Sequence, residues 1–380
     1  MKPTSKNYRK YKTVLIIRSN AIRPDSRVEK EANTLYNAGF RVGILAWDRD
    51  SNHPEHTEML YGNTEIPITR YGFKAGFGDG LKKIKQFLLF QIAIQRFIKK
   101  HNTDIDYIHA CDFDTAFFTY RLAHKLKKKF VFDIFDFIFG EPHNVFQVII
   151  NMAQIDIINH ADATIICSEE RRRQISKATP QKLTVIHNSP PMIESSGYVA
   201  DKDYVARVVY VGVLQNHRLL KEIGEFFREH SEYRFDVGGF GLHESFFERL
   251  DKECSNIYYH GRINYATTLE VEQRADIMLA IYDPSIENHR YAAPNKFYEG
   301  LMLGKPLIMA NGTGMSDVIE REHLGAVIDY SPEGFAKGME DIVGRRDDWE
   351  NISLRMKALY KEKYSWSEME KRLIQLYDNL

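Results

Sequence analysis

The chain has 380 residues, which is more than one ordinary domain contains and predicts two domains that can each bury a core. Basic and acidic residues number 52 each, so the formal net charge is zero. The sequence therefore lacks the basic excess of a general nucleic-acid binder, and we expect any charged partner to meet a local patch.

Cysteine usage and the first apolar run bear on the compartment. Cys111, Cys167 and Cys254 do not have the close spacing of metal sites, which favours a reducing environment. The apolar run at 14–17 is too short for the core of a signal peptide or for a membrane span. The sequence therefore predicts a cytoplasmic protein.

In the first half, short runs rich in β-branched residues alternate with segments of helical length. TVLIIR at 13–18 begins the series, and DYIHA, FVFDIFD, ATIICS and LTVIHN continue it. This alternation predicts an α/β fold with a doubly wound sheet of parallel strands. Unbroken apolar runs are typical of strands that are covered on both faces. Between 41 and 71, RVGILAW is followed by two strand-like stretches instead of a helix.

A stretch rich in proline, serine and acidic residues at 189–203 is interpreted as a linker. After it, RVVYVGV, YRFDVGG, NIYYHG, DIMLAIY, KPLIMAN and GAVIDY repeat the pattern, which predicts a second doubly wound sheet. The predicted domains are 1–190 and 204–362, and 363–380 is predicted to be a helix that packs back on the first domain. Because ligands bind open α/β sheets at the carboxyl ends of the strands, we expect the active site between the halves.

The segment RYAAPNKFYEGLMLGKP predicts a helix with an anion at its N-terminus. Pro294 suits the first helical position. Lys296 lies in the first turn, where it opposes the helix dipole unless a negative group lies in front of it. The small Ala293 lets a ligand approach the backbone N–H groups, and a phosphate or diphosphate fits such a position. The alternative is a surface ion pair between Lys296 and Glu299.

A glycine-rich turn, VGGFG, follows a strand and precedes a helix in the second half. Gly239 and Gly241 allow the backbone to approach a base or a phosphate. The alternative is a tight connection without a ligand.

Four polar residues lie at strand ends in the first half. His109 ends the strand DYIHA and Asp112 follows it, and we expect both to face an acceptor, although a hydrogen-bonded structural role suits His109 equally. Asp133 and Asp136 end another strand. Carboxylates in such places orient or deprotonate an acceptor hydroxyl, or else cap the next helix.

Together these motifs resemble a known family. PNKFYEGLMLGKPLIMANGTG is similar to the second half of the donor-binding segment of GT-B glycosyltransferases, in particular the retaining glycosyltransferase family 4. DSRVEKEANTLYNAGFRVGIL, VIHNSPP, YVGVLQNHR, VGGFG and YSWSEMEKRLIQLY extend the resemblance over nearly the whole chain. It implies a GT-B architecture of two facing Rossmann-like domains, with 1–190 binding the acceptor and 204–362 the nucleotide sugar.

The resemblance also implies roles for single residues. Glu299 matches the second of the family's paired glutamates, which holds the ribose, and Tyr291 stands at the position of the first. Arg218 matches a basic position after the first strand of the second domain, and we predict that it clamps the diphosphate together with Lys296. The predicted donor-binding residues are Gly212, Arg218, Gly239, Gly241, Tyr291, Ala293, Pro294, Asn295, Lys296 and Glu299.

The first half departs from the family pattern in two places. RPDSR at 23–27 replaces the usual glycine-rich loop, and Arg27 is expected to contact the acceptor. Phe135 stands where many members have histidine, so no single base is assured. Asp112 and Asp114 form an Asp-X-Asp triplet, which is a metal-diphosphate signature in another glycosyltransferase architecture. We predict no metal site, because the triplet lies in the wrong half for the donor.

The segment 81–101 carries six basic residues and no acid, together with apolar residues near one helical face. It predicts either peripheral contact with the inner face of the cell membrane or an ordinary helix that packs on the sheet.

The preferred hypothesis is a retaining, metal-independent glycosyltransferase without a cofactor, whose substrate is a UDP- or GDP-linked sugar. Its acceptor is a saccharide or lipid-linked saccharide of cell-surface polysaccharide biosynthesis. The alternatives are a nucleotide-sugar epimerase or hydrolase of the same architecture and a non-catalytic nucleotide-sugar-binding protein.

Overall fold

The computed structural model describes residues 12–53, 55–75, 80–138, 142–193 and 203–380, with side chains of the third range described from Ile84 on. The chain forms two compact units. Unit 1 comprises Met1–Ile186 together with Glu370–Leu380, and unit 2 comprises His187–Met369. The middle of the predicted linker, 194–202, lies outside the described residues.

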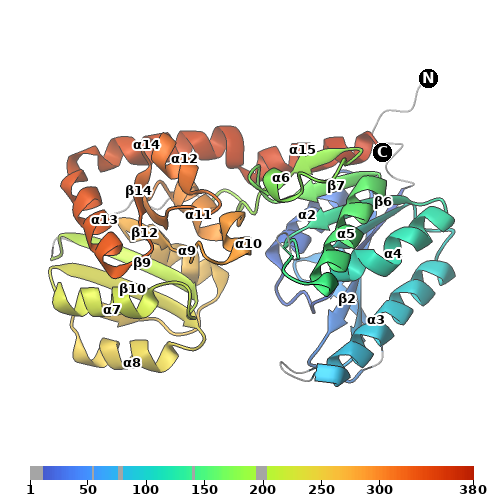
Figure 1. Ribbon diagram of the computed structural model, residues 1–380, viewed down its shortest axis with the longest axis horizontal. Helices are drawn as coiled ribbons and strands as arrows, with labels where there is room; N and C mark the ends of the chain where they lie inside the picture. Colours follow the sequence, from blue (N-terminus) through green and yellow to red (C-terminus); the bar gives the residue numbers. More distant parts are fainter. Residues whose placement is uncertain (1–11, 54, 76–79, 139–141, 194–202) are drawn as a thin grey trace. The chain divides into compact units, whose positions relative to one another are not determined.

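Unit 1 is built on a sheet with the strand order β3-β4-β2-β1-β5-β6-β7-β8 (Figure 1). In the described part of the chain its strands pair in parallel, apart from β3 with β4. The central strands are buried, as predicted for a sheet covered on both faces. The strands are β1 (Thr13–Arg18), β2 (Arg41–Asp48), β3 (His56–Leu60), β4 (Asn63–Gly72), β5 (Tyr107–Cys111), β6 (Lys129–Ile134), β7 (Ala163–Ile166) and β8 (Leu183–Val185).

The edge of this sheet differs from the purely parallel arrangement that was predicted. Strand β3 runs antiparallel to β4, because only Tyr61 and Gly62 join the two strands and a parallel pair needs a long crossover. Gly62 has a φ of 79°, which a glycine adopts without strain. The sheet of unit 1 is therefore mixed.

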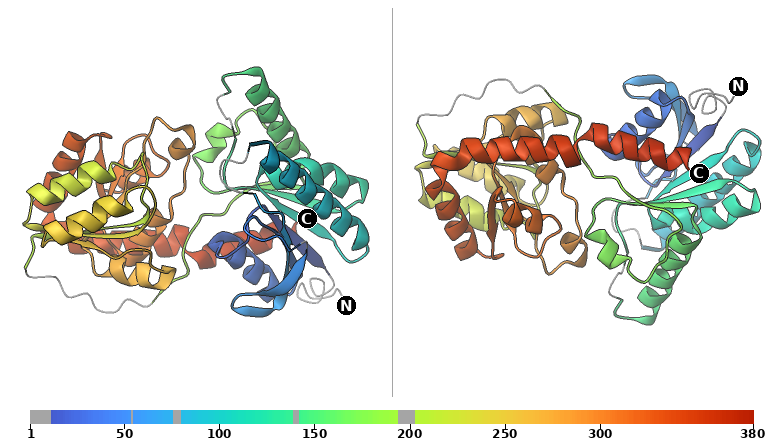
Figure 2. Two further views of the ribbon diagram at one scale, coloured as in Figure 1. Left: turned by 90° about the horizontal axis from the view of Figure 1, so that it is seen from below. Right: turned by 90° about the horizontal axis from the view of Figure 1, so that it is seen from above.

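The direction of each crossover decides which face of the sheet a helix covers. Helix α2 joins β1 to β2, whereas α3, α4 and α5 join strands that follow one another in the opposite direction across the sheet. These three helices therefore share one face, with α4 packed against both α3 and α5 (Figures 1 and 2). The helices are α2 (Ser26–Asn37), α3 (Gly80–Lys100), α4 (Phe113–Lys125), α5 (Val145–His160) and α6 (Arg171–Gln174).

Helix α3 is the basic segment that was predicted at 81–101. It buries Phe90, Ile94 and Ile98 in the core of unit 1, as an amphipathic helix on a sheet does. A second row of apolar side chains remains exposed, consisting of Ile84, Leu88 and Ile92.

The final helix, α15 (Trp366–Asp378), returns the chain to unit 1. Tyr377 is buried there with its ring edge-on to Phe40 and Tyr107. Its hydroxyl lies 2.8 Å from Nδ1 of His109, so the last helix is hydrogen-bonded to the middle of the sheet.

Tyr377→Phe should lower the free energy of unfolding of unit 1 by about 1–3 kcal/mol, because the variant leaves a nitrogen of the buried His109 without its partner. Urea unfolding, monitored by hydrogen exchange of the β5 amides, measures this free energy of unfolding. Tyr61→Phe is the control, since Tyr61 is 95% exposed. Equal exchange in both variants would contradict the role of the bond.

Unit 2 contains a second sheet in the order β11-β10-β9-β12-β13-β14, whose described pairings are all parallel. The prediction of two doubly wound, Rossmann-like units is confirmed. The strands are β9 (Ala206–Val213), β10 (Tyr233–Phe240), β11 (Ile257–Tyr259), β12 (Ile277–Ala280), β13 (Leu307–Ala310) and β14 (Gly325–Ile328).

Helices separate the strands of unit 2, and a 3₁₀ turn, η1 (Arg346–Asp348), and a π turn, η2 (Tyr360–Tyr364), flank its last helix. The helices are α7 (Leu220–Glu229), α8 (Glu244–Glu253), α9 (Tyr265–Gln273), α10 (Glu287–Arg290), α11 (Asn295–Leu303), α12 (Ser316–Arg321), α13 (Pro332–Gly344) and α14 (Trp349–Leu359).

A buried carboxylate joins β10 to its neighbours in unit 2. Asp236 accepts hydrogen bonds from Arg207 at 2.7 Å and Arg234 at 2.9 Å, and a ring nitrogen of His260 lies 2.7 Å away. Burial alone would raise the pKa of Asp236, but these three donors lower it to about 2.

Because the pKa of Asp236 is lower in the folded state than the ordinary value of 3.8, its contribution to stability is complete above pH 3.8. That contribution is lost as the pH falls through about 2. Asp236→Asn should therefore remove part of the acid dependence of unit 2, as measured by urea titrations at about pH 5 and about pH 3. Asp317→Asn, at an exposed position, should retain it.

In the described part of the chain, no helix combines the length and the apolar character that crossing a membrane requires.

Candidate donor and acceptor sites

The candidate donor site of unit 2 lies at the carboxyl ends of β9 and β12 and at the start of α11. Lys296, in the first turn of α11, reaches the end of β9, where its ammonium group lies 5.0 Å from the ring centroid of Tyr210. A Cβ atom on Gly212 would lie 3.0 Å from the Lys296 nitrogen, so the missing side chain leaves room for it. Burial opposes the charge of Lys296, but Tyr210, Tyr282 and nearby carboxyl groups raise its pKa.

Arg218 supplies a second cation to this site. Its guanidinium group lies 3.8 Å from the ring centroid of Tyr282, which follows β12. It donates to the carbonyl of His217 at 3.0 Å and to Nε2 of His289 at 3.2 Å. Since His289 Nδ1 donates to the carbonyl of Asp283, its Nε2 is free to accept, and burial lowers the pKa of His289. Both predicted cations therefore lie beside Tyr210 and Tyr282, whose rings contact them.

Helix α11 begins one residue later than predicted. Pro294 is the N-cap with a ψ of 133°, and the first helical residue is Asn295, which is exposed. Helix boundaries are the least certain part of a sequence prediction. Ala293 is buried, and its carbonyl accepts from the Asn188 amide at 3.1 Å. Gly304 ends the helix with a φ of 69°. The first N–H groups of α11 lack partners within the helix and can bind an anion beside Lys296.

Two buried carboxyl groups lie near Lys296. Glu299 is on α11, and Glu272 is on α9 with neither carboxyl oxygen hydrogen-bonded among the described residues. Burial, and then the charge of Glu299, raises the pKa of Glu272 well above its usual value. Tyr265, also on α9, hydrogen-bonds to Glu299, and burial raises the pKa of this tyrosine. Neither Glu272 nor Tyr265 could be predicted from the sequence, because nothing in α9 distinguishes them from surface residues of an ordinary helix.

Tyr291 follows α10 directly and is half-buried, with its N–H donating to the carbonyl of Asn288. It remains a predicted donor contact in place of the family's first glutamate.

The glycines of VGGFG have a structural reason of their own. Gly239 has a φ of 127°, and a Cβ there would lie 1.8 Å from the carbonyl oxygen of Gly212. Gly241 has a φ of 139°, and its Cβ would lie 2.6 Å from the carbonyl oxygen of Leu214. Both glycines therefore let the end of β10 approach the end of β9, which is the tight-connection alternative. A ligand role for them stays a prediction.

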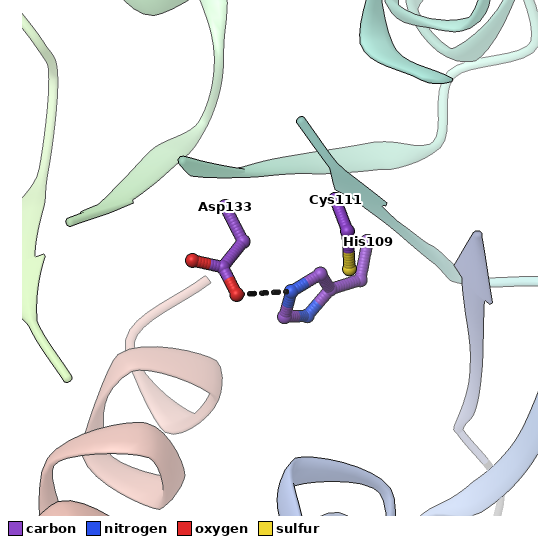
Figure 3. A group of neighbouring side chains, drawn as sticks. All are labelled: His109, Cys111 and Asp133. Carbon is purple, nitrogen blue, oxygen red and sulfur yellow. Dashed lines mark hydrogen bonds and ion pairs between the residues drawn. The ribbon is translucent and has the colours of Figure 1, made fainter. Parts of the chain in front are cut away.

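The candidate acceptor residues of unit 1 divide into a buried and a more accessible pair. His109 and Asp133 are fully buried, and Figure 3 shows their side chains pointing toward each other from neighbouring strands, with Nε2 and Oδ2 3.4 Å apart. Arg27 holds Asp133 through both carboxylate oxygens, at 2.7 and 3.2 Å. Burial alone would raise the pKa of Asp133, but the neighbouring Arg27 and His109 lower it.

Arg27 itself is almost fully buried and also pairs with Glu31 at 3.2 Å. In this conformation neither Arg27 nor His109 reaches solvent. The expectation that they contact an acceptor directly therefore has no exposed side-chain surface to support it here, and it stays a prediction.

Asp112 is a hydrogen-bonded anchor. One of its carboxylate oxygens accepts from the backbone N–H groups of Phe135 and Asp136 at 2.9 and 3.0 Å, and the other pairs with Arg18. Burial raises the pKa of Asp112 to about 6 although Arg18 opposes this. Asp112 thus holds the loop that carries Asp136, whose side chain is mostly exposed 3.8 Å from Arg171. Of the four predicted catalytic residues, Asp136 presents its carboxylate most openly.

His109, Cys111 and Asp133 place one possible ligand atom each within 4.8 Å of one another (Figure 3). Their surroundings do not suit a cation. Burial raises the pKa of the Cys111 thiol well above its usual value, and the guanidinium of Arg27 already neutralises Asp133. The cluster is better explained as a hydrogen-bonded support.

Comparisons with known proteins agree with this architecture. Residues 26–189 match the family model described as Glycosyltransferase Family 4, and residues 205–345 match the model described as Glycosyl transferases group 1. The first model matches most of unit 1, and the second matches most of unit 2. The chain is a GT-B glycosyltransferase of the family 4 type. No curated protein matches it by sequence.

Solved glycosyltransferase structures share the fold over nearly the whole chain, at low identity. Sucrose-phosphate synthase from Thermosynechococcus elongatus is 15% identical, with a TM-score of 0.75 over 97% of this chain and 98% of that one. Anabaena HepE in complex with UDP-glucose is 10% identical, with a TM-score of 0.72 over 97% and 100%. The catalytic domain of Arabidopsis thaliana starch synthase IV, bound to ADP and acarbose, is 13% identical, with a TM-score of 0.67 over 97% and 99%.

Gly212→Ala tests the arrangement around Lys296. The new methyl group would lie 3.0 Å from the Lys296 nitrogen and 3.3 Å from the Tyr210 hydroxyl, so the cation must move. We expect the affinity for UDP to fall by at least about fivefold, because the anion loses a positioned charge. Gly43→Ala is the matched control, as its methyl group would meet nothing within 4 Å. Calorimetric titration gives both affinities, and unchanged binding by the Gly212 variant would place the diphosphate elsewhere.

Proposed function

We propose that this glycosyltransferase moves a sugar, with retention of anomeric configuration, from a nucleotide-diphospho sugar bound on unit 2 to a saccharide or lipid-linked saccharide. We place the reaction in cell-surface polysaccharide biosynthesis. The observation that carries the proposal is the pair of cations, Lys296 and Arg218, beside the N-terminus of α11 at the strand ends of unit 2. HepE in complex with UDP-glucose and starch synthase IV bound to ADP share the fold, which supports a nucleotide-linked donor.

The charges suit the bond that breaks. When the bond between the anomeric carbon and the diphosphate oxygen breaks, the leaving diphosphate keeps the electron pair and gains negative charge. Lys296, Arg218 and the N–H groups of α11 lie where they can stabilise that charge before the reaction starts. The acceptor oxygen then bonds to the anomeric carbon on the same face, and its proton passes to an oxygen of the leaving diphosphate. This scheme requires neither a metal nor a cofactor.

The remaining roles are part of the same proposal. Glu299 holds the ribose, and Tyr291 with Asn295 contributes to the recognition of the donor sugar. Unit 1 binds the acceptor near Asp136. A peripheral contact of the segment 81–101 with the inner face of the cell membrane would bring a lipid-linked acceptor to the protein.

Lys296→Ala and Arg218→Ala should each lower turnover by at least about tenfold, because each removes a charge that stabilises the leaving group. Lys337→Ala, at an exposed lysine of the same unit, should have no effect. The assay incubates each protein with a panel of nucleotide sugars, with and without membrane lipid extract, and follows nucleotide release.

The same assay separates the alternatives. Nucleotide release that depends on an acceptor, with a product of unchanged anomeric configuration by proton NMR, supports the proposal. An isomerised donor indicates an epimerase, release into water alone a hydrolase, and binding without turnover a nucleotide-sugar-binding protein. Each of these three results contradicts transfer, and full activity of both cation variants contradicts the proposed roles.

A further inference from the structure

The first half of helix α5 exposes its apolar face instead of burying it. Val145, Val148, Ile149 and Met152 follow the spacing i, i+3, i+4 and i+7, which marks one face of a helix and is the usual pattern of a buried face. Here that face points to solvent. With Phe146 beside it, four of the five side chains are 60–77% exposed and Val148 is 41% exposed. These five residues are called the α5 apolar face below.

Polar groups hold the helix in this orientation. Asn151 and Gln154 lie on the opposite side and are buried. The Gln154 amide pairs with both backbone groups of Ile138, accepting from its N–H at 2.9 Å and donating to its carbonyl. Rotating α5 to bury its apolar face would break these bonds and leave two amide side chains to be satisfied elsewhere. The exposure is therefore built into the packing of the helix.

The charges on the neighbouring helices have one dominant sign. On the described side chains of α3, α4 and α5, the acidic residues are Asp114, which is half-buried, and Asp156, which hydrogen-bonds to the hydroxyl of Tyr120. The exposed charges of α3 and α4 are basic, and α4 lies against both other helices (Figure 1). The exposed basic residues are Lys85, Arg96, Lys99, Lys100, Arg121 and Lys125.

Exposed apolar side chains on a surface rich in cations match the chemistry of an anionic lipid bilayer. Apolar side chains of an interfacial helix enter the boundary between headgroups and acyl chains, while lysine and arginine attract anionic headgroups. A second copy of this chain fits less well, because pairing this surface with itself would bring like charges together.

We propose that unit 1 docks on an anionic membrane surface through the α3–α4–α5 layer, with the α5 apolar face entering the lipid. The main membrane contact is thereby made by a helix outside 81–101. Helix α3 contributes its positive charges and its exposed row of Ile84, Leu88 and Ile92. Docking does not depend on the chemistry of unit 2. If the protein does not dock on membranes, the proposed transfer reaction is unaffected. If it does not transfer a sugar, the proposed docking surface is unaffected.

The test is flotation of the full chain with two kinds of vesicle, one of pure phosphatidylcholine and one containing about one third phosphatidylglycerol. We expect binding to the anionic vesicles that weakens as salt is added. Phe146→Gln combined with Ile149→Gln should lower the partition coefficient by at least about tenfold, because two inserted side chains are lost. Leu354→Gln on α14 is the matched control, since Leu354 is 63% exposed on unit 2, and it should bind like the unchanged protein.

Two results would overturn the proposal. One is that the double variant and the unchanged protein do not differ, whether both bind or neither binds. The other is a dimer, detected by light scattering without lipid, that the double variant dissociates, since this would assign the α5 apolar face to a second copy. Nucleotide release with a water-soluble acceptor should be the same in the double variant and the unchanged protein, which verifies that the variant is folded.

Discussion

A parallel sheet that is covered on both faces has little room for polar side chains except at the ends of its strands, and the candidate sites of both units lie at such ends. In unit 2, the approach of β10 to β9 is close enough to require Gly239, and it leaves the end of β9 open beside Gly212. Lys296 enters that opening from α11. The geometry of the candidate donor site thus depends on two residues that have no side chain.

Unit 1 carries charges inside, as unit 2 does at Asp236. Asp133 is compensated by Arg27, and His109 completes the set together with Tyr377 from the last helix. A buried charge is tolerated only when partners satisfy it, and removing one partner costs more than the pair contributes. These residues consequently support the strand ends, while Asp112 and the loop of Asp136 form the accessible part.

Much of this could be predicted from the sequence, for identifiable reasons. Apolar runs and their spacing predicted the parallel strands of both units, because a strand that is buried on both faces is recognised in a sequence as a continuous apolar run. Periodicity does not say which face of a helix points inward, so the orientation of α5 could not be predicted. Nor could the burial of His109, because the strand that was predicted to end there continues to Cys111 and places His109 in its buried middle. Glu272 had no signal, because its environment is created by Glu299 from another helix.

The division of the chain also has a consequence for its synthesis. Unit 2 is one continuous segment, His187–Met369, whereas unit 1 needs Glu370–Leu380 to cover the face on which Tyr377 lies. Domains generally fold as they leave the ribosome, from the N-terminal side onward. Here the unit that is made first must wait for the residues that are made after unit 2. The second unit can complete its fold earlier, and the first leaves the face beside β5 uncovered for the time needed to translate everything between.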